Sequence, residues 1–414
     1  MLFTLISLFW TIFLLDKQKK LNIKLFEQES NVQSMLIEML DGIQEIKINS
    51  IEKEIRWRWR AVKSKHEAVY NKWNNLQQVQ LTGNDIINQL KNILITFLSV
   101  ILVIQGEITI GIMMAIQFII GQLNTPVSQF SSLITIIQDN SMALERLSTV
   151  HLGATETENQ KHEEAPMNQG FTLQNIAFCY EGSNYKPILE HINLNIPEKT
   201  ITALVGKSGA GKTTLLKLLF KFYEPTKGII KFGDKNLAEL SYSTFRSKCG
   251  VVLQDGYIFS DTIEGNICLK QEKINNQRFI EVTKIACVNE FIFQFEAGYA
   301  TKVSANGNQL SKGQKQRICL ARALYKNPDI LFLDEATSAI DATTEKKIIA
   351  NIKKYCSNMT IIIVAHRLNM IKSADQIAVL ERGTVTELGS HLQLIKKKGS
   401  YYKLIKEQLD NIKM

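Results

Sequence analysis

The chain has 414 residues, with 49 basic and 40 acidic side chains and a formal net charge of +9. This length allows two or three domains, and the ordinary composition, 45% hydrophobic, excludes a largely disordered protein. The charge excess lies almost entirely beyond residue 150, because residues 1–150 hold 14 basic and 13 acidic residues. A modest basic excess suits an anionic partner such as nucleotide phosphate.

The first segment, 1–15, reads MLFTLISLFWTIFLL and contains no charge. Positive charges follow this run instead of preceding it, which argues against a signal peptide and predicts that its C-terminal end is cytosolic. Fifteen helical residues reach about 22 Å, less than the roughly 30 Å of a bilayer core. We therefore interpret the segment as a spanning helix without its beginning.

Two further uncharged runs, 92–106 and 108–138, are separated only by Glu107. A turn at Gly106-Glu107 would make them a helical hairpin that crosses the membrane twice, with spans at about 84–106 and 108–128. The alternative is a pair of buried helices in a soluble protein. We favour the membrane, because 31 consecutive uncharged residues exceed the buried face of a globular helix.

Residues 16–90 are polar and free of proline, which predicts long helices that leave the membrane and turn back. Within them, EIRWRWRAVKSK (54–65) could bind nucleic acid, lie on a membrane surface or be an ordinary amphipathic helix. We expect it to lie at the turn, as a cytosolic coupling region over about 48–62 that docks through Ile51, Ile55 and Trp59. Plain helix packing is the alternative.

A polar segment, 151–169, predicts a linker between a membrane domain (1–150) and a second domain (170–414). All six cysteines lie in the second domain, and their spacing suggests neither zinc binding nor disulfides. We expect them to be reduced.

The stretch ITALVGKSGAGKTTLLKLLF (201–220) predicts a buried strand, a glycine-rich turn and a helix. It matches the phosphate-loop pattern at Gly206, Gly211, Lys212 and Thr213. Glycines let backbone N–H groups surround an anion at a helix N-terminus. Lys212 can reach the β- and γ-phosphates, and the Thr213 hydroxyl can bind Mg²⁺.

Further candidate site residues lie at the ends of three other apolar strands and at the start of one helix. Asp334 and Glu335 end the strand in DILFLDEATSAID, where an acidic residue is the usual second magnesium contact. Gln254 and His366 follow other strands, although a lone histidine is more often structural. Ser311 and Gly313 open the helix of LSKGQKQRICLARAL, where they can donate to phosphate.

In this order the motifs resemble those of ATP-binding cassette (ABC) exporters, over essentially the whole chain. EMLDGIQEIKINSIE and FIIGQLNTPVSQF are most similar to peptidase-containing bacteriocin or peptide exporters. The resemblance implies an α-helical transmembrane bundle followed by an α/β P-loop NTPase domain with a helical subdomain. It also implies ATP and Mg²⁺ as cofactors, with ATP sandwiched between two chains.

The resemblance assigns roles by position. Glu335 would be the catalytic glutamate, His366 the switch histidine, Gln254 the glutamine that senses Mg²⁺ and water, and Tyr180 the ring that stacks on adenine. Lys212 would also be catalytic, and Asp341 would lie at the dimer interface. The metal would be held by Thr213, Gln254 and Asp334. The implied nucleotide contacts are Tyr180, Gly206, Lys207, Ser208, Gly209, Ala210, Gly211, Lys212, Thr213, Thr214, Gln254, Asp334, Ser311, Gly313, Gln314 and Asp341.

Three features depart from the family pattern. Lys312 replaces a glycine of the LSGGQ signature, and the loop SANG (304–307) lacks the usual acidic residue, which puts coupling to the membrane domain in doubt. The chain also has about three spans in place of six and no N-terminal protease. We therefore expect a truncated chain, or one that complements another subunit.

The expected function is ATP-driven export of a peptide or bacteriocin-like substrate by a dimer. We expect a multi-pass protein of the cell membrane, with its nucleotide-binding domain in the cytoplasm. The expected partners are a second half-transporter, forming a homodimer, the lipid bilayer and a peptide; no nucleic acid is expected. Two alternatives are an ATP-binding or hydrolysing remnant without transport, and a soluble ABC-type ATPase that acts on nucleic acid.

Overall fold

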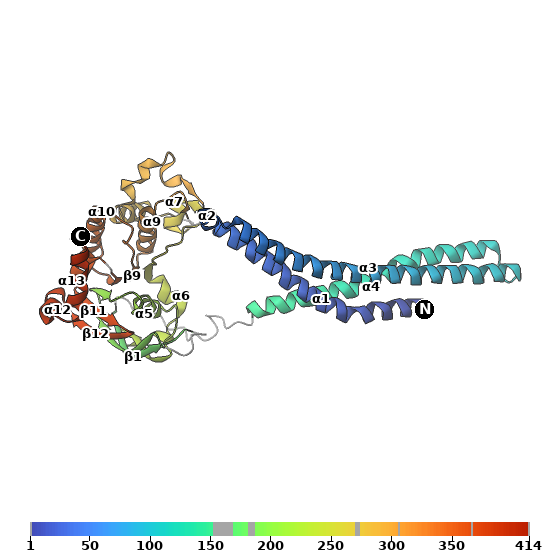
Figure 1. Cartoon of the computed structure of the whole chain (residues 1–414), viewed down its shortest axis with the longest axis horizontal. Coiled ribbons are helices and arrows are strands. Elements are labelled where there is room, and N and C mark those ends of the chain that lie inside the picture. Colours follow the sequence, from blue (N-terminus) through green and yellow to red (C-terminus); the bar gives the residue numbers. More distant parts are fainter. Residues whose placement is uncertain are drawn as a thin grey trace. The chain divides into compact units, whose positions relative to one another are not determined.

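The computed structural model describes residues 2–151, 169–180, 187–269, 274–304, 307–365 and 367–412. It divides into two compact units, Met1–Ala154 and Thr155–Met414, which are described separately (Figure 1). The first unit is helical, and the second combines sheets and helices.

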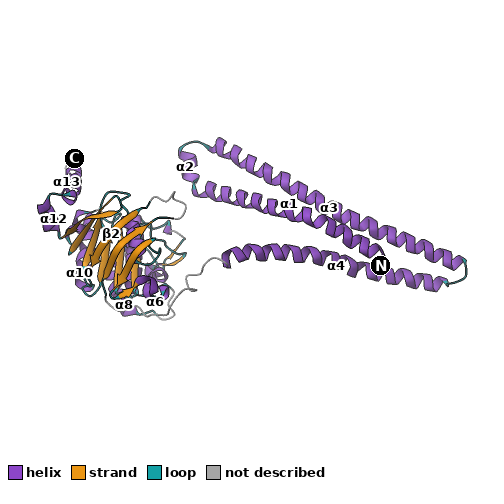
Figure 2. Cartoon of the chain, turned by 90° about the horizontal axis from the view of Figure 1, so that it is seen from below, coloured by secondary structure: helices purple, strands orange, loops and turns teal. Residues whose placement is uncertain are grey.

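Three long helices and one short helix form the first unit (Figure 2). They are α1 (Leu2–Asp41), α2 (Ile43–Ile48), α3 (Glu52–Ile104) and α4 (Ile110–His151). α3 and α4 form the predicted hairpin, and Gly106, in the turn between them, has a φ of 78°. Glycine adopts this left-handed conformation without the steric cost that a Cβ brings.

The turn between the long helices α1 and α3 lies earlier than predicted. The chain reverses between α1 and α3 through α2, so the short helix occupies Ile43–Ile48 and not 48–62. The tryptophan-arginine run is part of α3, in which Trp57 is 69% exposed and Arg60 lies over its ring at 5.6 Å. Sequence reasoning misplaced the turn because no proline marks it, and Gly42 supplies the break.

Where the first half of α1 packs on α3, the interface is rich in polar side chains and the outer surface is apolar. Ser7, Thr11 and Gln18 of α1 are buried, whereas Phe9 and Phe13 are 71% and 68% exposed. Across the interface, Ser7 Oγ donates to Asn84 Oδ1 at 3.0 Å, Trp10 Nε1 donates to the Gln80 carbonyl at 3.4 Å, and the Gln18 amide donates to the Gln80 side chain. This arrangement is typical of helices in lipid, where small and polar residues join helices and apolar residues face outward.

Among the described residues, one helix, α3, is both long and apolar enough to cross a membrane, and 6% of its most apolar stretch is buried in the structure. A core helix of a soluble protein would be mostly buried. The exposure of this stretch therefore agrees with a lipid-facing helix.

A six-stranded sheet forms the centre of the second unit, in the order β12-β11-β3-β10-β9-β6. All neighbouring strands are parallel except β11 and β12. Both faces of the sheet are covered, which explains the continuous apolar runs seen in the sequence. The strands are β3 (Ile201–Val205), β6 (Cys249–Val252), β9 (Ile330–Asp334), β10 (Thr360–Val364), β11 (Gln376–Glu381) and β12 (Thr384–Gly389).

A second, antiparallel sheet has the order β2-β1-β4-β5. Its strands are β1 (Phe171–Phe178), β2 (Leu189–Ile196), β4 (Lys227–Phe232) and β5 (Lys235–Asn236), and β7 (Asp261–Thr262) pairs separately with β8 (Lys302–Val303). The two larger sheets share a core, in which the Phe171 ring lies 5.1 Å from Phe232 and 6.2 Å from Phe332.

Helices cover these sheets and form the predicted helical subdomain, in which α7, α8 and α9 share a core with Ile267, Val282 and Ile318 at its centre. The α-helices are α5 (Lys212–Leu219), α6 (Tyr242–Ser247), α7 (Ile263–Cys268), α8 (Asn276–Ile285), α9 (Lys312–Tyr325), α10 (Ala342–Tyr355), α11 (Leu368–Lys372), α12 (His391–Lys397) and α13 (Ser400–Ile412). The 3-10 turns are η1 (Leu237–Glu239), η2 (Val288–Glu290), η3 (Ile292–Gln294) and η4 (Gly298–Ala300).

All six cysteines lie in described residues and are free, and five are buried. Burial raises the pKa of Cys356 to about 11. This agrees with the prediction of reduced, structural thiols.

Candidate functional site

The loop between β3 and α5 is tightly enclosed. Gly209 and Gly211 have φ values of 78° and 95°, which favour glycine. A Cβ at Gly206 would lie 2.2 Å from the carbonyl oxygen of Leu380, and one at Gly211 would lie 2.6 Å from Leu189 Cδ2. The predicted glycine pattern therefore has a steric cause. Lys207, Ser208 and Ala210 complete the loop.

Lys212, the first residue of α5, folds back over this loop. Its Nζ donates to the carbonyls of Gly206 and Lys207, at 2.9 Å each, and the residue is 6% exposed. Burial lowers the pKa of Lys212, while the nearby carboxylates of Glu335 and Asp334 act in the opposite direction. The ammonium thus lies against the phosphate loop, bound to two of its carbonyls.

The side chains of Thr213, on α5, and Asp334, at the end of β9, are in contact. Thr213 Oγ1 donates to Asp334 Oδ1 at 3.3 Å, although 121 residues separate them. Burial raises the pKa of Asp334, and the hydrogen bond from Thr213 opposes this shift. A hydroxyl and a carboxylate side by side suit Mg²⁺, which prefers oxygen ligands and usually binds through one or two carboxylates, waters and substrate phosphates. Within the described residues, no group of three or more acidic, His or Cys side chains could hold a metal ion.

Glu335 follows Asp334 and adopts a φ of 49°, a conformation that non-glycine residues rarely take. Its N–H donates to the Val364 carbonyl at 3.2 Å, at the end of β10. Backbone strain of this kind persists where surrounding contacts hold it, and it is concentrated at functional sites. The side chain is half-buried beside Asp334.

Sequence reasoning missed Gln316, which is buried on α9. Its Nε2 donates to the Glu335 carbonyl at 3.2 Å and to Ser338 Oγ at 3.0 Å, and its Oε1 accepts from the Ala339 N–H at 3.0 Å. Gln316 is buried with Ile318 and Cys319 on the same helix. The sequence KGQKQR is polar throughout, so it gave no sign of this burial. Gln316 connects the helix of the signature motif to the segment after β9.

The signature residues stabilise the start of α9. Ser311 caps the helix in a capping box with Gln314, and a Cβ at Gly313 would lie 2.8 Å from the Ala339 carbonyl oxygen. Lys312 is exposed at the first helical position. None of the hydrogen bonds found among the described residues joins 310–314 to the phosphate loop.

The other predicted residues are placed as follows. The Tyr180 hydroxyl lies 3.2 Å from Thr214 Oγ1, beside the phosphate loop. Gln254 is exposed beyond β6 and lines a cavity with Lys312 and Ser338. Asp341 caps α10 by accepting from the N–H groups of Thr343 and Thr344, which lower the pKa of its carboxyl. His366 and residues 305–306 of the SANG loop lie outside the described residues.

Two family models match this chain. One, described as ABC transporter, matches residues 189–338, which contain the phosphate loop, Asp334 and Glu335. The other, described as ABC transporter transmembrane region, matches residues 1–127. The chain belongs to the ABC transporter family. A fused membrane region and ATP-binding domain are therefore established, as the sequence predicted.

Individual ABC proteins extend this comparison. The alpha-hemolysin translocation ATP-binding protein HlyB of Escherichia coli and the leukotoxin export ATP-binding protein LtxB of Aggregatibacter actinomycetemcomitans are each 34% identical, over 95% of this chain and 55% of their own length. The structure of a bacterial Atm1-family ABC exporter with ATP bound superposes with a TM-score of 0.92 at 27% identity, covering 98% of this chain and 72% of that one.

The chain thus spans about half the length of the curated relatives it matches. These similarities show an ABC-type ATP-binding domain fused to an ABC transporter transmembrane region, in an inner or plasma membrane protein whose nucleotide-binding domain is cytoplasmic.

Proposed function

We propose that this ABC chain works in a dimer that hydrolyses ATP with Mg²⁺ to drive export of a peptide or bacteriocin-like cargo. The contact between Thr213 and Asp334, beside the buried Lys212, carries the ATPase part of this proposal. The exposed apolar side chains at the start of α1 and the end of α3, such as Phe9, Phe13 and Phe97, support the membrane part.

Each proposed catalytic role follows from position. Lys212 would hold the β- and γ-phosphates from within the loop, and Thr213 and Asp334 would hold Mg²⁺, which supplies positive charge beside those phosphates. Glu335 would orient the attacking water and accept its proton as the bond from the γ-phosphorus to the leaving ADP oxygen breaks. Gln254 and His366 are proposed to complete the γ-phosphate side.

The proposal of a dimer rests on the signature motif. Ser311, Gly313 and Gln314 open α9, with Ser311 exposed and the other two half-buried, and we propose that they face the nucleotide of a second copy. Asp341, exposed at the start of α10, would lie at the same interface. Lys312 projects from this surface, and we propose that it permits activity because Ser311 and Gly313 are retained.

We propose that α2 is the coupling helix. Ile43 and Ile48 on this short helix are 46% and 77% exposed, which leaves an apolar surface at the tip of the helical unit. This assignment replaces the region 48–62, because Trp57 and Trp59 lie within α3.

The cargo is proposed from similarity, since the names of HlyB and LtxB assign toxins to those proteins. A chain that hydrolyses ATP without transport is the second candidate, suggested by the sequence SANG (304–307), which lacks the acidic residue usual in the family. A soluble ATPase on nucleic acid is disfavoured by the exposed apolar faces of α1 and α3.

Reconstitution tests these candidates. The detergent-purified chain should hydrolyse ATP, and Glu335→Gln should lower turnover by about 10²- to 10⁴-fold, the usual contribution of a general base, while ATP binding is retained. Inside-out vesicles should then accumulate a fluorescent peptide only with the active chain. Hydrolysis without accumulation for any peptide of a diverse library would favour the remnant, and buffer solubility without detergent would contradict the membrane assignment.

A further inference from the structure

Tyr180, the proposed adenine-stacking residue, is itself fixed by aromatic neighbours. Its ring lies edge-to-face against Phe178, at 4.9 Å and 85°, and against Tyr223, at 5.3 Å and 85°. Its hydroxyl reaches Thr214 Oγ1 on α5. Phe178 lies only two residues before Tyr180, whereas Tyr223 is a distant residue whose ring limits the motion of the Tyr180 ring.

Tyr223 belongs to a turn that immediately follows the phosphate-loop helix. The Phe222 N–H donates to the Lys217 carbonyl at 2.9 Å and the Lys221 N–H donates to the Leu218 carbonyl at 3.1 Å, the two bonds of a Schellman motif. Glycine usually occupies the left-handed position of this motif, but here Lys221 does, with a φ of 57°. The turn is therefore strained unless other contacts hold it.

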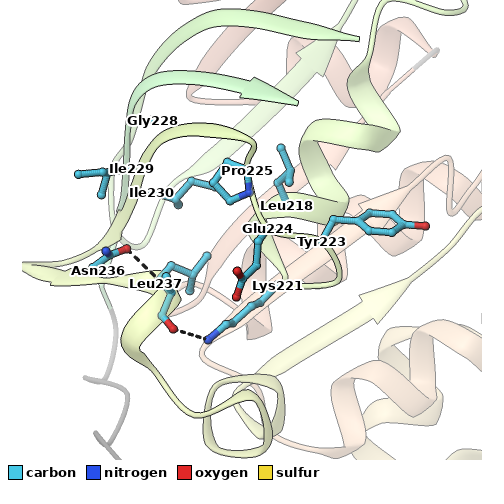
Figure 3. A pocket seen from close by; sticks show the side chains of 11 residues that line it. Leu218, Lys221, Tyr223, Glu224, Pro225, Gly228, Ile229, Ile230, Asn236 and Leu237 are labelled. Carbon is cyan, nitrogen blue, oxygen red and sulfur yellow. Dashed lines mark hydrogen bonds between the residues drawn. The ribbon is translucent and has the colours of Figure 1, made fainter. Parts of the chain in front are cut away.

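Contacts of Lys221 supply that restraint. The residue is 2% exposed, its ammonium donates to the carbonyls of Ala238 and Leu240, and it lies 4.1 Å from the centre of the Tyr242 ring. In Figure 3 the Lys221 side chain runs to the η1 turn across a cavity of about 130 Å³, whereas the Tyr223 ring extends away from it. Arg246 Nη2 adds a bond to the Lys221 carbonyl at 2.6 Å.

The far end of the turn is joined to β1. The Thr226 N–H donates to the Ala177 carbonyl at 2.9 Å, and the Cys179 N–H donates to Thr226 Oγ1 at 3.3 Å. These bonds attach the turn to the residues directly before Tyr180. The turn that carries Tyr223 is thus fixed at both ends, to the phosphate-loop helix and to the segment just before Tyr180.

We infer that Tyr223 is a positioning residue for nucleotide binding, which holds the Tyr180 ring in the orientation that stacks on the base. This inference rests on the proposed ATP-binding function and adds a residue that does not itself touch the nucleotide. An edge-to-face aromatic pair is worth about 0.5–1.5 kcal/mol beyond its buried area, which sets the size of the effect. Because the phosphates contact the loop and not the base-stacking ring, the effect should depend on the base.

The test compares ATP with inorganic tripolyphosphate, which lacks a base, by calorimetry on the full chain in detergent with Mg²⁺. A Glu335→Gln background prevents turnover. Tyr223→Ala should weaken ATP binding about two- to tenfold and leave tripolyphosphate binding unchanged. Tyr223→Phe should restore ATP affinity, since the ring is kept. Tyr355→Ala, an equal truncation of an exposed ring on α10, is the matched control and should bind both as the parent does.

Tyr180→Ala distinguishes base stacking by Tyr180 from the positioning role of Tyr223. If it weakens ATP binding and Tyr223→Ala does not, the positioning role is wrong and the proposed function stands. If Tyr223→Ala weakens tripolyphosphate as much as ATP, the residue is only structural and the inference fails. Equal affinity of the parent chain for ATP and tripolyphosphate would show that the base adds nothing to binding, and the inference would fail. Absence of ATP binding would overturn the proposed function itself.

Discussion

Gln316 Nε2 donates to the backbone carbonyl of Glu335 at 3.2 Å, so a buried amide on the signature helix contacts the residue proposed to be catalytic. The same side chain accepts from the Ala339 N–H, and these bonds hold the segment in which Glu335 has its left-handed backbone. Control of this segment by α9 provides the first prediction.

Gln316→Leu should lower the rate of ATP hydrolysis about tenfold with little change in ATP affinity. The substitution removes one hydrogen bond to the Glu335 carbonyl and one from the Ala339 N–H, each worth about 0.5–1.5 kcal/mol, and so loosens the strained segment. Steady-state kinetics and nucleotide binding measure the two effects. Gln309→Leu, on an exposed residue, is the control. A normal rate in Gln316→Leu would show that the contact does not orient Glu335.

The pair formed by Thr213 and Asp334 predicts a magnesium-dependent loss. Thr213→Val should weaken binding of Mg²⁺-ATP about tenfold, because a hydrogen bond or ligand to a charged group is worth about 1.5–3 kcal/mol. Removal of Mg²⁺ with EDTA should weaken ATP binding to the parent chain more than ATP binding to the variant. If EDTA affected both equally, the hydroxyl would not be a metal ligand.

Asp334 should also destabilise the domain in the absence of nucleotide. Because burial raises its pKa, the folded state favours the protonated carboxyl, and the stability associated with that form is lost as the pH rises from the unfolded value of 3.8 through the raised folded pKa. Asp334→Asn should therefore melt at a higher temperature than the parent at pH 7. This difference should shrink as the pH falls towards 3.8.

The control for this experiment is Asp329→Asn, at a half-buried position just before β9 whose backbone N–H donates to the Lys248 carbonyl. Addition of Mg²⁺-ATP should raise the melting temperature of the parent and have little effect on Asp334→Asn. A lower melting temperature for ligand-free Asp334→Asn would contradict the desolvation argument.

The position of α2 predicts which exposed apolar residues matter for coupling. Ile48→Asn should lower peptide transport at least about fivefold and spare basal ATPase activity, because loss of a buried isoleucine at a contact costs about 1 kcal/mol or more. Trp57→Ala, equally exposed but within α3, should transport normally. The reverse result would return the coupling role to the tryptophan-arginine run.

The polar seam between α1 and α3 predicts a modest loss of stability. Gln80→Leu should destabilise the helix pair by about 0.6–2 kcal/mol, the range for polar contacts between membrane helices. Thermal unfolding in detergent would detect this change. Val79→Leu, on the exposed neighbouring position, should have no effect, and an unchanged Gln80→Leu would mean that the seam forms no net stabilising contact.

Local motifs predicted much of the nucleotide-binding unit. Phosphate-loop glycines, the DE pair after an apolar strand and the continuous apolar runs of a covered parallel sheet are all short-range patterns, and each has a direct steric or chemical cause. The hairpin at Gly106 was predicted for the same reason, since a single glycine and one charge interrupt a long apolar run.

The tertiary structure decided features that depend on distant contacts. The turn at Ile43–Ile48 was misplaced because Gly42 alone marks it, and the run at 54–65 looked exceptional by its letters although it is an ordinary part of α3. The roles of Gln316 and Tyr223 follow from partners 19 and 43 residues away, at Glu335 and Tyr180. Sequence alone determined which residues could bind phosphate and enter lipid, whereas folding decided which side chains hold those residues in place, because burial and long-range hydrogen bonds exist only once distant segments pack together.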